Sequence, residues 1–392
     1  MNPKSTIRDC RAARSRFLFA AICVAGGASV AYAQTPMRQY SSKYYEIYTD
    51  LEGDALRDAD ARITAMAETY YKRTRGFSGT IRSKMPFYLF RHAADYYKRG
   101  GMQGSAGMYN GQALMAIAGK EVTPATWHVI QHEGFHQFVD RVIGGEIPVW
   151  VNEGLAEYFG EAIFTGDRYV TGVIPPDRLE RLRAWIGSGN VISVSDMMRM
   201  PHHRWNEQLS IVNYDQAWSM VHFLAHAENG KYQKAFESFI SAVGKGQDWQ
   251  TAWKRNFGAD TRAFERKWRE YWAAQNSQSS ADVYAEAACE ILTQFYARAF
   301  AQRQYYPTFE AFLADAKAGA LKADSKDWLP DTLLREALAY MERFAATWSL
   351  GGGTSKNQIV CDPGDGTKFI GTIRLKSGRV RSVSVREVRA GR

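Results

Sequence analysis

Two histidines and a glutamate in the segment 130–138 are placed so that they could bind a metal ion and activate water. It places His132, Glu133 and His136 in the order His-Glu-x-x-His. On a helix, His132 and His136 lie on the same face, about 6 Å apart along the axis, so both imidazoles can reach one ion. Glu133 is rotated by roughly 100° from His132 and can reach a water molecule instead. The pattern therefore predicts a hydrolytic metal site with Glu133 as general base.

A second segment, seventeen residues after His136, supplies a third ligand. Glu153 lies there in the sequence Asn152-Glu153-Gly154, on an expected helix. Catalytic zinc is bound by three protein ligands and leaves its fourth position to water. We therefore predict one zinc ion bound by His132, His136 and Glu153. Glu157, one turn later, is predicted to accept the outer N–H of a ligating histidine and fix its tautomer. The alternative for these carboxylates is a solvated acidic face.

A metal-dependent hydrolase also needs a donor to the oxyanion of its transition state, and Tyr214 is the candidate. Asn213 and Gln216 have the spacing of a capping pair, which would place Tyr214 in the first turn of a helix. Positive potential at that helix end would favour negative charge near the hydroxyl. His202 or His203 could act in its place.

Three further histidines are expected to play no part in catalysis. His128 lies about 12 Å from His136 along the same helix, too far to share a small tetrahedral site, and is predicted to pack or to lie at the rim. His222 and His226 are also four residues apart, but no Glu between them could serve as a base. A structural role is favoured for both.

Two helices and a strand must position the predicted site. Thr123 can cap a helix that starts at Pro124, carries apolar residues to Phe138 and ends at the glycines 144–145. Residues 108–118 are predicted to form a strand before this helix, and 148–275 to be mostly helical. Further elements are expected at 44–48 and 85–90 (strands), 54–74, 281–303, 309–320 and 331–350 (helices), and over the last 40 residues (strands, with a hairpin turn at 376–379).

Residues 1–33 have the pattern of a secretory signal peptide. Five basic residues precede an apolar run at 17–30, and Ala31-Tyr32-Ala33 follows as a small-x-small cleavage site. The run is shorter than the ~20 residues that span a bilayer, and no later apolar run is as long. We expect an exported protein, periplasmic or extracellular, without a membrane span. The predicted organisation is a signal peptide (1–33), a catalytic domain (34–276) and a C-terminal accessory domain of unknown role (281–392).

The charge of the chain argues against nucleic-acid binding, and its cysteines leave two possibilities open. The formal net charge is +9, but the leader carries four of these charges and the other basic residues are dispersed, so nucleic-acid binding is not predicted. Weak contact with anionic envelope polymers is compatible with this charge. Cys289 and Cys361 lie outside the leader, and the sequence leaves open whether they form a disulfide or remain buried thiols.

The motifs resemble those of the gluzincin metallopeptidases, including uncharacterised secreted bacterial members, over residues 44–272. Asn152-Glu153-Gly154 is similar to the helix that supplies their third zinc ligand, and Glu157 looks like the acidic residue that supports a zinc-bound histidine in thermolysin-like members. Tyr214-Asp215-Gln216-Ala217 is similar to the Tyr-x-x-Gly motif of aminopeptidase-like members, with Ala for Gly. The resemblance implies an α+β fold, with a small N-terminal mixed sheet and a helical subdomain in the catalytic domain.

Two departures from the family pattern narrow the expected activity. The interval from His136 to Glu153 is slightly shorter than in those relatives, and residues 107–111 lack the acidic residue with which aminopeptidases hold a free amine. We therefore expect a secreted zinc endopeptidase that binds a peptide or protein along the strand 108–118. Two alternatives stay open: a non-catalytic envelope-binding protein with a structural metal site, and a zinc amidase acting on a non-peptide substrate.

Overall fold

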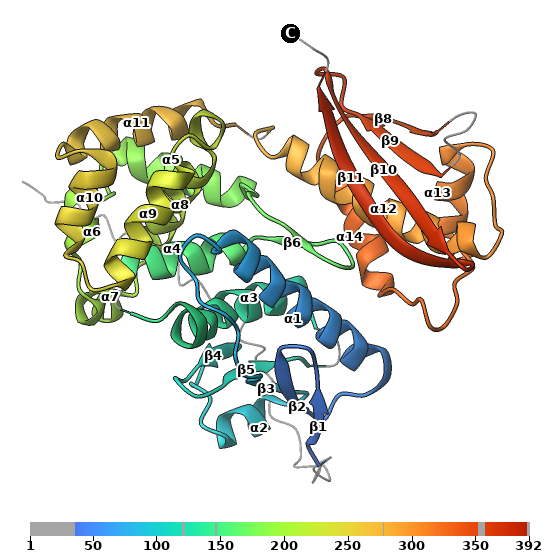
Figure 1. The fold of residues 1–392 in the computed structure, drawn as a ribbon, viewed down its shortest axis with the longest axis horizontal. Coiled ribbons are helices and arrows are strands. Elements are labelled where there is room, and N and C mark those ends of the chain that lie inside the picture. The colour runs from blue at the N-terminus through green and yellow to red at the C-terminus, as the bar shows by residue number, and fades with distance from the viewer. Residues whose placement is uncertain (1–35, 120–121, 146, 277, 352–356, 390–392) are drawn as a thin grey trace, which may run out of the picture.

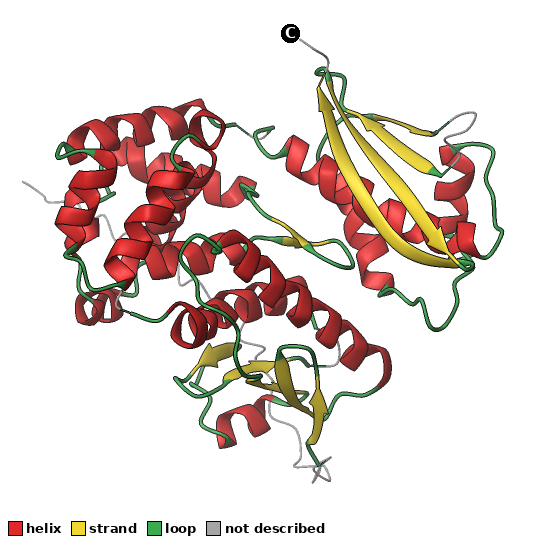
Figure 2. Cartoon of the chain, viewed as in Figure 1, coloured by secondary structure: helices red, strands yellow, loops and turns green. Residues whose placement is uncertain are grey.

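The computed structural model describes residues 36–119, 122–145, 147–276, 278–351 and 357–389. The predicted signal peptide lies outside these ranges. The described chain mixes helices with three separate sheets, which confirms the α+β class (Figure 2). No helix in the described ranges is long and apolar enough to cross a membrane.

A five-stranded mixed sheet forms the N-terminal layer, in the order β1-β2-β3-β5-β4. Strands β2, β3 and β5 are parallel, whereas β1 and β4 run antiparallel to their neighbours. Helices α1 and α3 pack against this layer (Figure 1). The elements are β1 (Arg38–Ser41), β2 (Tyr45–Thr49), α1 (Gly53–Arg73), β3 (Met85–Phe90), α2 (Ala93–Lys98), β4 (Gly107–Tyr109), β5 (Leu114–Ile117) and α3 (Pro124–Phe138).

The prediction of one strand over 108–118 was wrong. The stretch is a hairpin of β4 and β5, because the side-chain oxygen of Asn110 accepts the backbone N–H groups of Gln112 and Ala113 and turns the chain. Such a turn of the Asn side chain onto its own backbone competes with extended structure. The hairpin makes β4 the edge strand of the sheet, beside α3.

Helix α3 begins as predicted, at Pro124, and the Thr123 hydroxyl accepts the backbone N–H of Thr126 at 3.2 Å. It continues as a π-helix, Val139–Ile143, and the chain leaves the helix at Gly144, whose φ is +69°. The buried face of α3 packs against α1, where the rings of Phe135 and Phe138 meet Tyr70 edge-on. This aromatic contact holds the helix that carries the predicted metal ligands.

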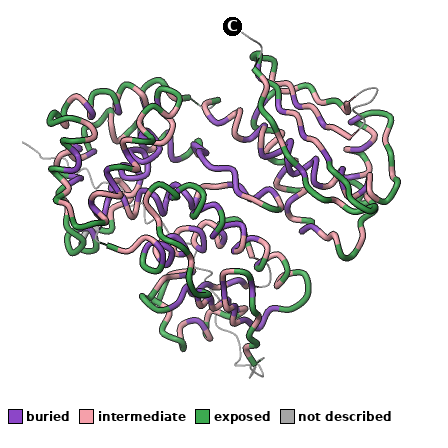
Figure 3. Tube along the Cα trace, viewed as in Figure 1, coloured by how far each residue is buried: buried purple, intermediate pink, exposed green. Residues whose placement is uncertain are grey.

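Eight helices, most of them short, and a two-stranded sheet follow the helix α3 and its π-helical extension within the described ranges. The helices are α4 (Val149–Gly160), α5 (Pro176–Ser188), α6 (Val194–Arg199), α7 (His202–Gln208), α8 (Ile211–Gly230), α9 (Gln233–Gly244), α10 (Trp249–Phe257) and α11 (Thr261–Ala274), and the strands are β6 (Ile163–Phe164) and β7 (Tyr169–Val170). Helix α4 lies between α3 and α8 and has its most extensive contacts with these two. It is buried along most of its length (Figure 3).

The C-terminal part is a helical layer on an antiparallel sheet of order β11-β10-β9-β8. The predicted turn at 376–379 is confirmed, but the helix predicted over 331–350 ends at Met341, because residues 347–350 pair with β9 instead. The elements are α12 (Ala281–Ala301), α13 (Phe309–Lys317), α14 (Asp331–Met341), β8 (Thr347–Leu350), β9 (Gln358–Asp362), β10 (Thr367–Lys376) and β11 (Arg379–Arg389). Cys289 and Cys361 are buried free thiols in this part.

Polar contacts, some of them buried, join the C-terminal part to the rest of the chain. Arg168, in the turn between β6 and β7, pairs with Glu286 at 2.9 Å and with Glu290. Burial raises the pKa of Glu290 to about 7, although Arg168 opposes the shift. Ser280, just before α12, is buried and its hydroxyl accepts the backbone N–H of Ile174 at 2.6 Å. One hydrophobic core runs from the N-terminal sheet to α12.

Gly154 permits the close approach of α4 to α8, so Gly154→Ala should lower the free energy of unfolding. A Cβ at Gly154 would lie 2.5 Å from the carbonyl oxygen of Ala217 and 2.7 Å from a methyl of Val221, so the two helices would have to separate. Overpacking of this kind costs about 1–3 kcal/mol in the free energy of unfolding. Gly187→Ala is the matched control, because a Cβ there meets open space and an alanine in a helix gains about 0.5–1 kcal/mol. Urea unfolding of both variants should give shifts of opposite sign.

Candidate metal centre

Three side-chain atoms from two helices converge on one point. The Nε2 atoms of His132 and His136, one turn apart on α3, are 3.1 Å from each other. The Oε2 atom of Glu153, on α4, lies 3.5 Å from each of them. The structure therefore brings together the three residues that the sequence predicted as ligands, in a group that could hold a metal ion.

The spacing of these atoms fits a small tetrahedral ion. Zinc binds imidazole nitrogen and carboxylate oxygen at about 2.0–2.1 Å, which places neighbouring ligand atoms about 3.3–3.4 Å apart. The three observed separations, 3.1, 3.5 and 3.5 Å, lie on either side of that value. The side chains of the three residues keep between 13% and 17% of their surface exposed, so the group is open to solvent on one side.

The outer nitrogen of each histidine faces an oxygen that can only accept a hydrogen bond. Nδ1 of His132 lies 3.1 Å from Oε1 of Glu157, and Nδ1 of His136 lies 3.2 Å from the side-chain oxygen of Asn152. Each neutral imidazole must therefore carry its proton on Nδ1 and turn the lone pair of Nε2 toward Glu153. Three electron-pair donors then meet with no proton between them, an arrangement that a bound cation stabilises.

The pKa shifts describe a site that attracts positive charge. Burial disfavours the charged imidazole of His132, but the hydrogen bonds to Glu153 and Glu157 outweigh this and raise its pKa well above the ordinary value. Burial opposes the charge of Glu153 as well, yet the two histidines hold its pKa at about 2. Without a metal ion, a proton on the histidines partly neutralises the carboxylates. Protons and metal ions therefore compete for the same place.

Glu133 lies outside the converging group and is held by the edge strand. Its Oε2 accepts the backbone N–H of Tyr109 on β4 at 2.8 Å. The hydroxyl of Tyr109 in turn donates to Asp140 at 2.5 Å. The bond from the Tyr109 backbone fixes Oε2 of Glu133; Oε1 has no hydrogen bond within the part of the chain that the structure describes and can accept a proton. The role of β4 in holding Glu133 had no signal in the sequence, because a backbone donor carries no residue type.

Tyr214 lies beside the metal group, with its ring centre 6.4 Å from that of His132. Its ring also packs edge-on against Trp205 at 5.1 Å. Burial raises the pKa of Tyr214 above its ordinary value, and the nearby Glu153 carboxylate adds to the shift, so the hydroxyl stays protonated and able to donate. His202 and His203 are exposed at the start of α7.

The predicted capping pair was wrong. Helix α8 begins at Ile211, after Ser210, so Tyr214 lies beyond its first turn. The Asn213 amide faces the sulfur of Met200 at 3.8 Å, and Gln216 bonds both backbone polar groups of Ile192. Tertiary contacts therefore use both side chains that suggested a helix start. Tyr214, the fourth residue of α8, packs against Trp205 of α7 and lies near His132 of α3.

A second group of possible ligands, His128 with Glu157 and Glu161, is already supplied with positive charge. Its donor atoms also lie within 4.8 Å of one another. However, the guanidinium of Arg178 bonds Glu157 and lies 3.4 Å from Glu161. Burial opposes the charge of Glu157, but Arg178 and then His132 hold its pKa well below the ordinary value. His128 lies at the rim, 3.8 Å from both carboxylates.

The pair His222 and His226 makes structural contacts. His222 is buried and its Nε2 lies 3.1 Å from the carbonyl oxygen of Gly172. His226 bonds the hydroxyl of Tyr158 at 2.9 Å. Burial lowers the pKa of His222 to about 4 and that of His226 well below its ordinary value, so both stay neutral in the core.

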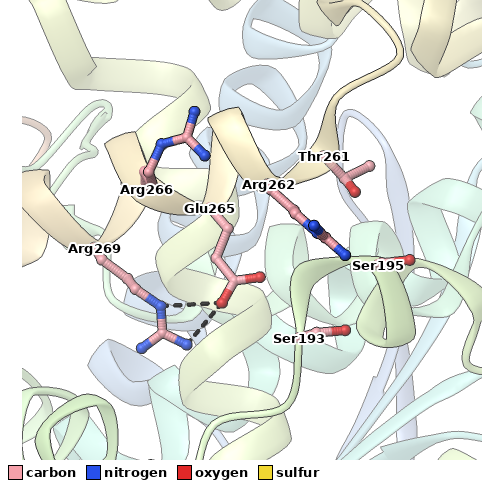
Figure 4. Close-up of a pocket in the computed structure, with 7 residues that line it drawn as sticks. All are labelled: Ser193, Ser195, Thr261, Arg262, Glu265, Arg266 and Arg269. Carbon is pink, nitrogen blue, oxygen red and sulfur yellow. Dashed lines mark hydrogen bonds and ion pairs between the residues drawn. The ribbon is translucent and has the colours of Figure 1, made fainter.

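Two of the cavities in the helical part of the described chain differ in their relation to the metal group. One, of about 1030 Å³, is bounded by the start of α4 and the connections α6–α7 and α9–α10, and it includes Asn152 and His202 in its lining. The other, of about 650 Å³, lies against α11 (Figure 4). Its one acidic residue, Glu265, is engaged by Arg269 at 2.7 Å and by the backbone N–H of Val194. This second cavity therefore offers basic charge but no group that could act as a base or a metal ligand.

The chain has little similarity to proteins of known function. Residues 126–247 match a family described as "Protein of unknown function (DUF1570)". No curated protein and no solved structure matches the sequence. The matched stretch contains the metal group, Glu133 and Tyr214, and it ends before the C-terminal part. The match therefore assigns no activity to the site.

The competition between protons and metal predicts that zinc affinity rises with pH. The pKa of His132 is raised, so its protonated form persists above the ordinary histidine range and zinc must displace that proton. Each displaced proton makes the dissociation constant fall about tenfold per pH unit until the pH exceeds the pKa. Chelator competition between about pH 6 and about pH 8 measures this slope. An affinity independent of pH over that interval would contradict the assignment of histidine ligands.

Proposed function

We propose that the chain is a zinc-dependent peptidase. One observation carries the proposal: two imidazole nitrogens and a carboxylate oxygen converge at 3.1–3.5 Å, and a further carboxylate, Glu133, lies next to them in sequence but outside the group. A metal site that only stabilises the fold has no use for a base beside it. The combination supports a gluzincin-like hydrolytic site, with His132, His136 and Glu153 as the residues that would hold zinc.

The chemistry divides among the residues according to their positions. Zinc supplies Lewis acidity, which polarises a carbonyl and lowers the pKa of water. Glu133 takes the proton from the attacking water and later delivers it to the leaving amine. The backbone N–H of Tyr109 keeps the Glu133 carboxylate oriented for this transfer. Tyr214 donates a hydrogen bond to the carbonyl oxygen as negative charge develops on it.

The surroundings of the site favour an internal peptide bond as substrate. An aminopeptidase needs a free carboxylate near the edge strand to hold the substrate amine, and Asp140, which contacts β4, is already engaged by Tyr109 and by Arg141 at 3.4 Å. The cavity of about 1030 Å³ reaches Asn152, the residue before Glu153, and offers room for substrate side chains. An endopeptidase that binds an extended chain along β4 is therefore the activity we propose.

Glu133→Gln should abolish peptide hydrolysis and leave zinc binding intact. The amide keeps the shape of the side chain and its contact with Tyr109 but cannot take a proton, and a general base contributes about 10²–10⁴-fold to the rate. Casein cleavage by the purified protein, with and without a chelator, measures the effect. Glu180→Gln, at an exposed position of α5, is the matched control. Activity that survives Glu133→Gln, or the addition of chelator, would contradict the proposed mechanism.

Tyr214→Phe should lower kcat by about 10²–10³-fold, the usual effect of removing one oxyanion donor. Because the hydroxyl acts in the transition state, KM should change little, and zinc affinity should stay the same since Tyr214 is not among the three ligands. Tyr71→Phe, on the exposed side of α1, is the control. An unchanged kcat in Tyr214→Phe would show that Tyr214 is not the oxyanion donor, and His202 and His203 would be the next candidates.

A further inference from the structure

A buried arginine, Arg178, links helix α4, which carries Glu153, to helix α8, which carries Tyr214. Arg178 is the third residue of α5, and its side chain is 10% exposed. It bonds Glu157 on α4 and reaches Asp215 on α8, where Nε lies 3.1 Å from Oδ1. Glu157 is the partner of His132, and Asp215 follows Tyr214 directly in sequence. One guanidinium thus contacts both the residue behind a metal ligand and the residue next to the proposed oxyanion donor.

The two oxygens of Glu157 are divided between two partners. Oε2 accepts from Arg178, and Oε1 faces Nδ1 of His132 at 3.1 Å. A carboxylate bonded through one oxygen only could rotate and withdraw the other from the histidine. With Arg178 on Oε2, the plane of the carboxylate is fixed and Oε1 stays aimed at His132, which turns Nε2 of that ring toward the metal position. The arginine acts on the metal ligand through Glu157.

The guanidinium of Arg178 suits this set of contacts. It presents five N–H donors in a fixed planar fork, whereas a lysine would carry three donors on a single nitrogen at the end of a flexible chain. Arg178 directs Nη2 at Glu157 and Nε at Asp215, whereas its Nη1 lies 3.4 Å from Glu161 without a hydrogen bond; its guanidinium carbon lies 5.1 Å from the ring centre of Trp218. Arg181, one turn on, bonds both oxygens of Asp215, at 3.0 and 3.2 Å.

We propose that Arg178 is a positioning residue of the metal centre: it holds Glu157, and through Glu157 it orients His132 for zinc. The inference rests on the proposed function for the identity of the metal site, but not on peptide hydrolysis. It predicts a loss of metal affinity upon substitution of a residue that touches neither the ion nor the substrate.

The test is zinc affinity of the full chain, measured by competition with a chromophoric chelator. Supporting residues of this kind typically contribute 10- to 100-fold to metal affinity, and we expect Arg178→Met to weaken zinc binding by about that factor. Arg178→Lys, which keeps the charge but not the fork, should weaken it by a smaller factor. Arg181→Met, which loses the pair with Asp215 but leaves Glu157 untouched, should stay within about twofold of the unsubstituted protein. The absorption spectrum of bound cobalt(II) should change in the two Arg178 variants and not in Arg181→Met.

A double substitution separates positioning from general loss of structure. If Arg178 acts through Glu157, then Glu157→Gln together with Arg178→Met should bind zinc no more weakly than Glu157→Gln alone. The inference would be overturned if the losses of zinc affinity in the two single variants multiplied in the double variant. It would also be overturned if Arg178→Met bound zinc as tightly as the unsubstituted protein. If Arg178→Met fails to fold, Arg178→Lys provides the test. An unchanged zinc affinity together with an unchanged cobalt(II) spectrum in Arg178→Lys would contradict the inference.

These results are distinguishable from a failure of the proposed function. A protein that binds zinc but cleaves no peptide would contradict the peptidase proposal, while the affinities of the Arg178 variants would still support or overturn the positioning role. A protein that binds no zinc at all would overturn both.

Discussion

Three lone pairs meet on one side of helix α3, and this convergence constrains the elements around it. Both histidines have their outer nitrogens committed to oxygens, Glu157 for His132 and Asn152 for His136, so neither ring can turn its proton inward without losing a buried hydrogen bond. Leaving such a bond unmade in a buried place costs about 1–3 kcal/mol. The inward nitrogens and the Glu153 carboxylate therefore favour a positive charge between them, which either a proton or a metal ion can supply. The nitrogen lone pairs and the carboxylate repel one another, so helices α3 and α4 must hold the three side chains together.

The surrounding architecture does so mainly by letting α4 approach its neighbours closely. Gly154 follows the ligand Glu153 directly and faces the backbone of α8, so the residue that allows close packing and the residue that completes the metal group share one turn. On the other side, the aromatic contact of Phe135 and Phe138 with Tyr70 fixes α3 against α1. Arg178 adds a charged link between α4 and α8. Apolar packing thus sets where the helices lie, and buried ion pairs set how the site residues are turned.

Much of this site could be predicted from the sequence because its signals are local. The spacing of His132, Glu133 and His136 needs only helical geometry, and Thr123 with Pro124 marks the helix start through contacts within four residues. Predictions failed where tertiary contacts overrode local ones. Asn213 and Gln216 have the spacing of a cap but bond residues from the α6 region, and residues 347–350 leave the predicted helix to pair with β9. Arg178 had no signal in the sequence, because Glu157 lies 21 positions before it and Asp215 lies 37 positions after it, each on another helix.

X-ray absorption at the zinc edge reports the atoms around a bound ion without depending on any substrate. The purified full chain should retain one zinc ion surrounded by nitrogen and oxygen ligands at about 2.0–2.1 Å, with the outer-shell scattering of two imidazole rings. A spectrum with no imidazole scattering, or with six oxygen neighbours typical of a loosely held ion, would contradict the predicted metal site.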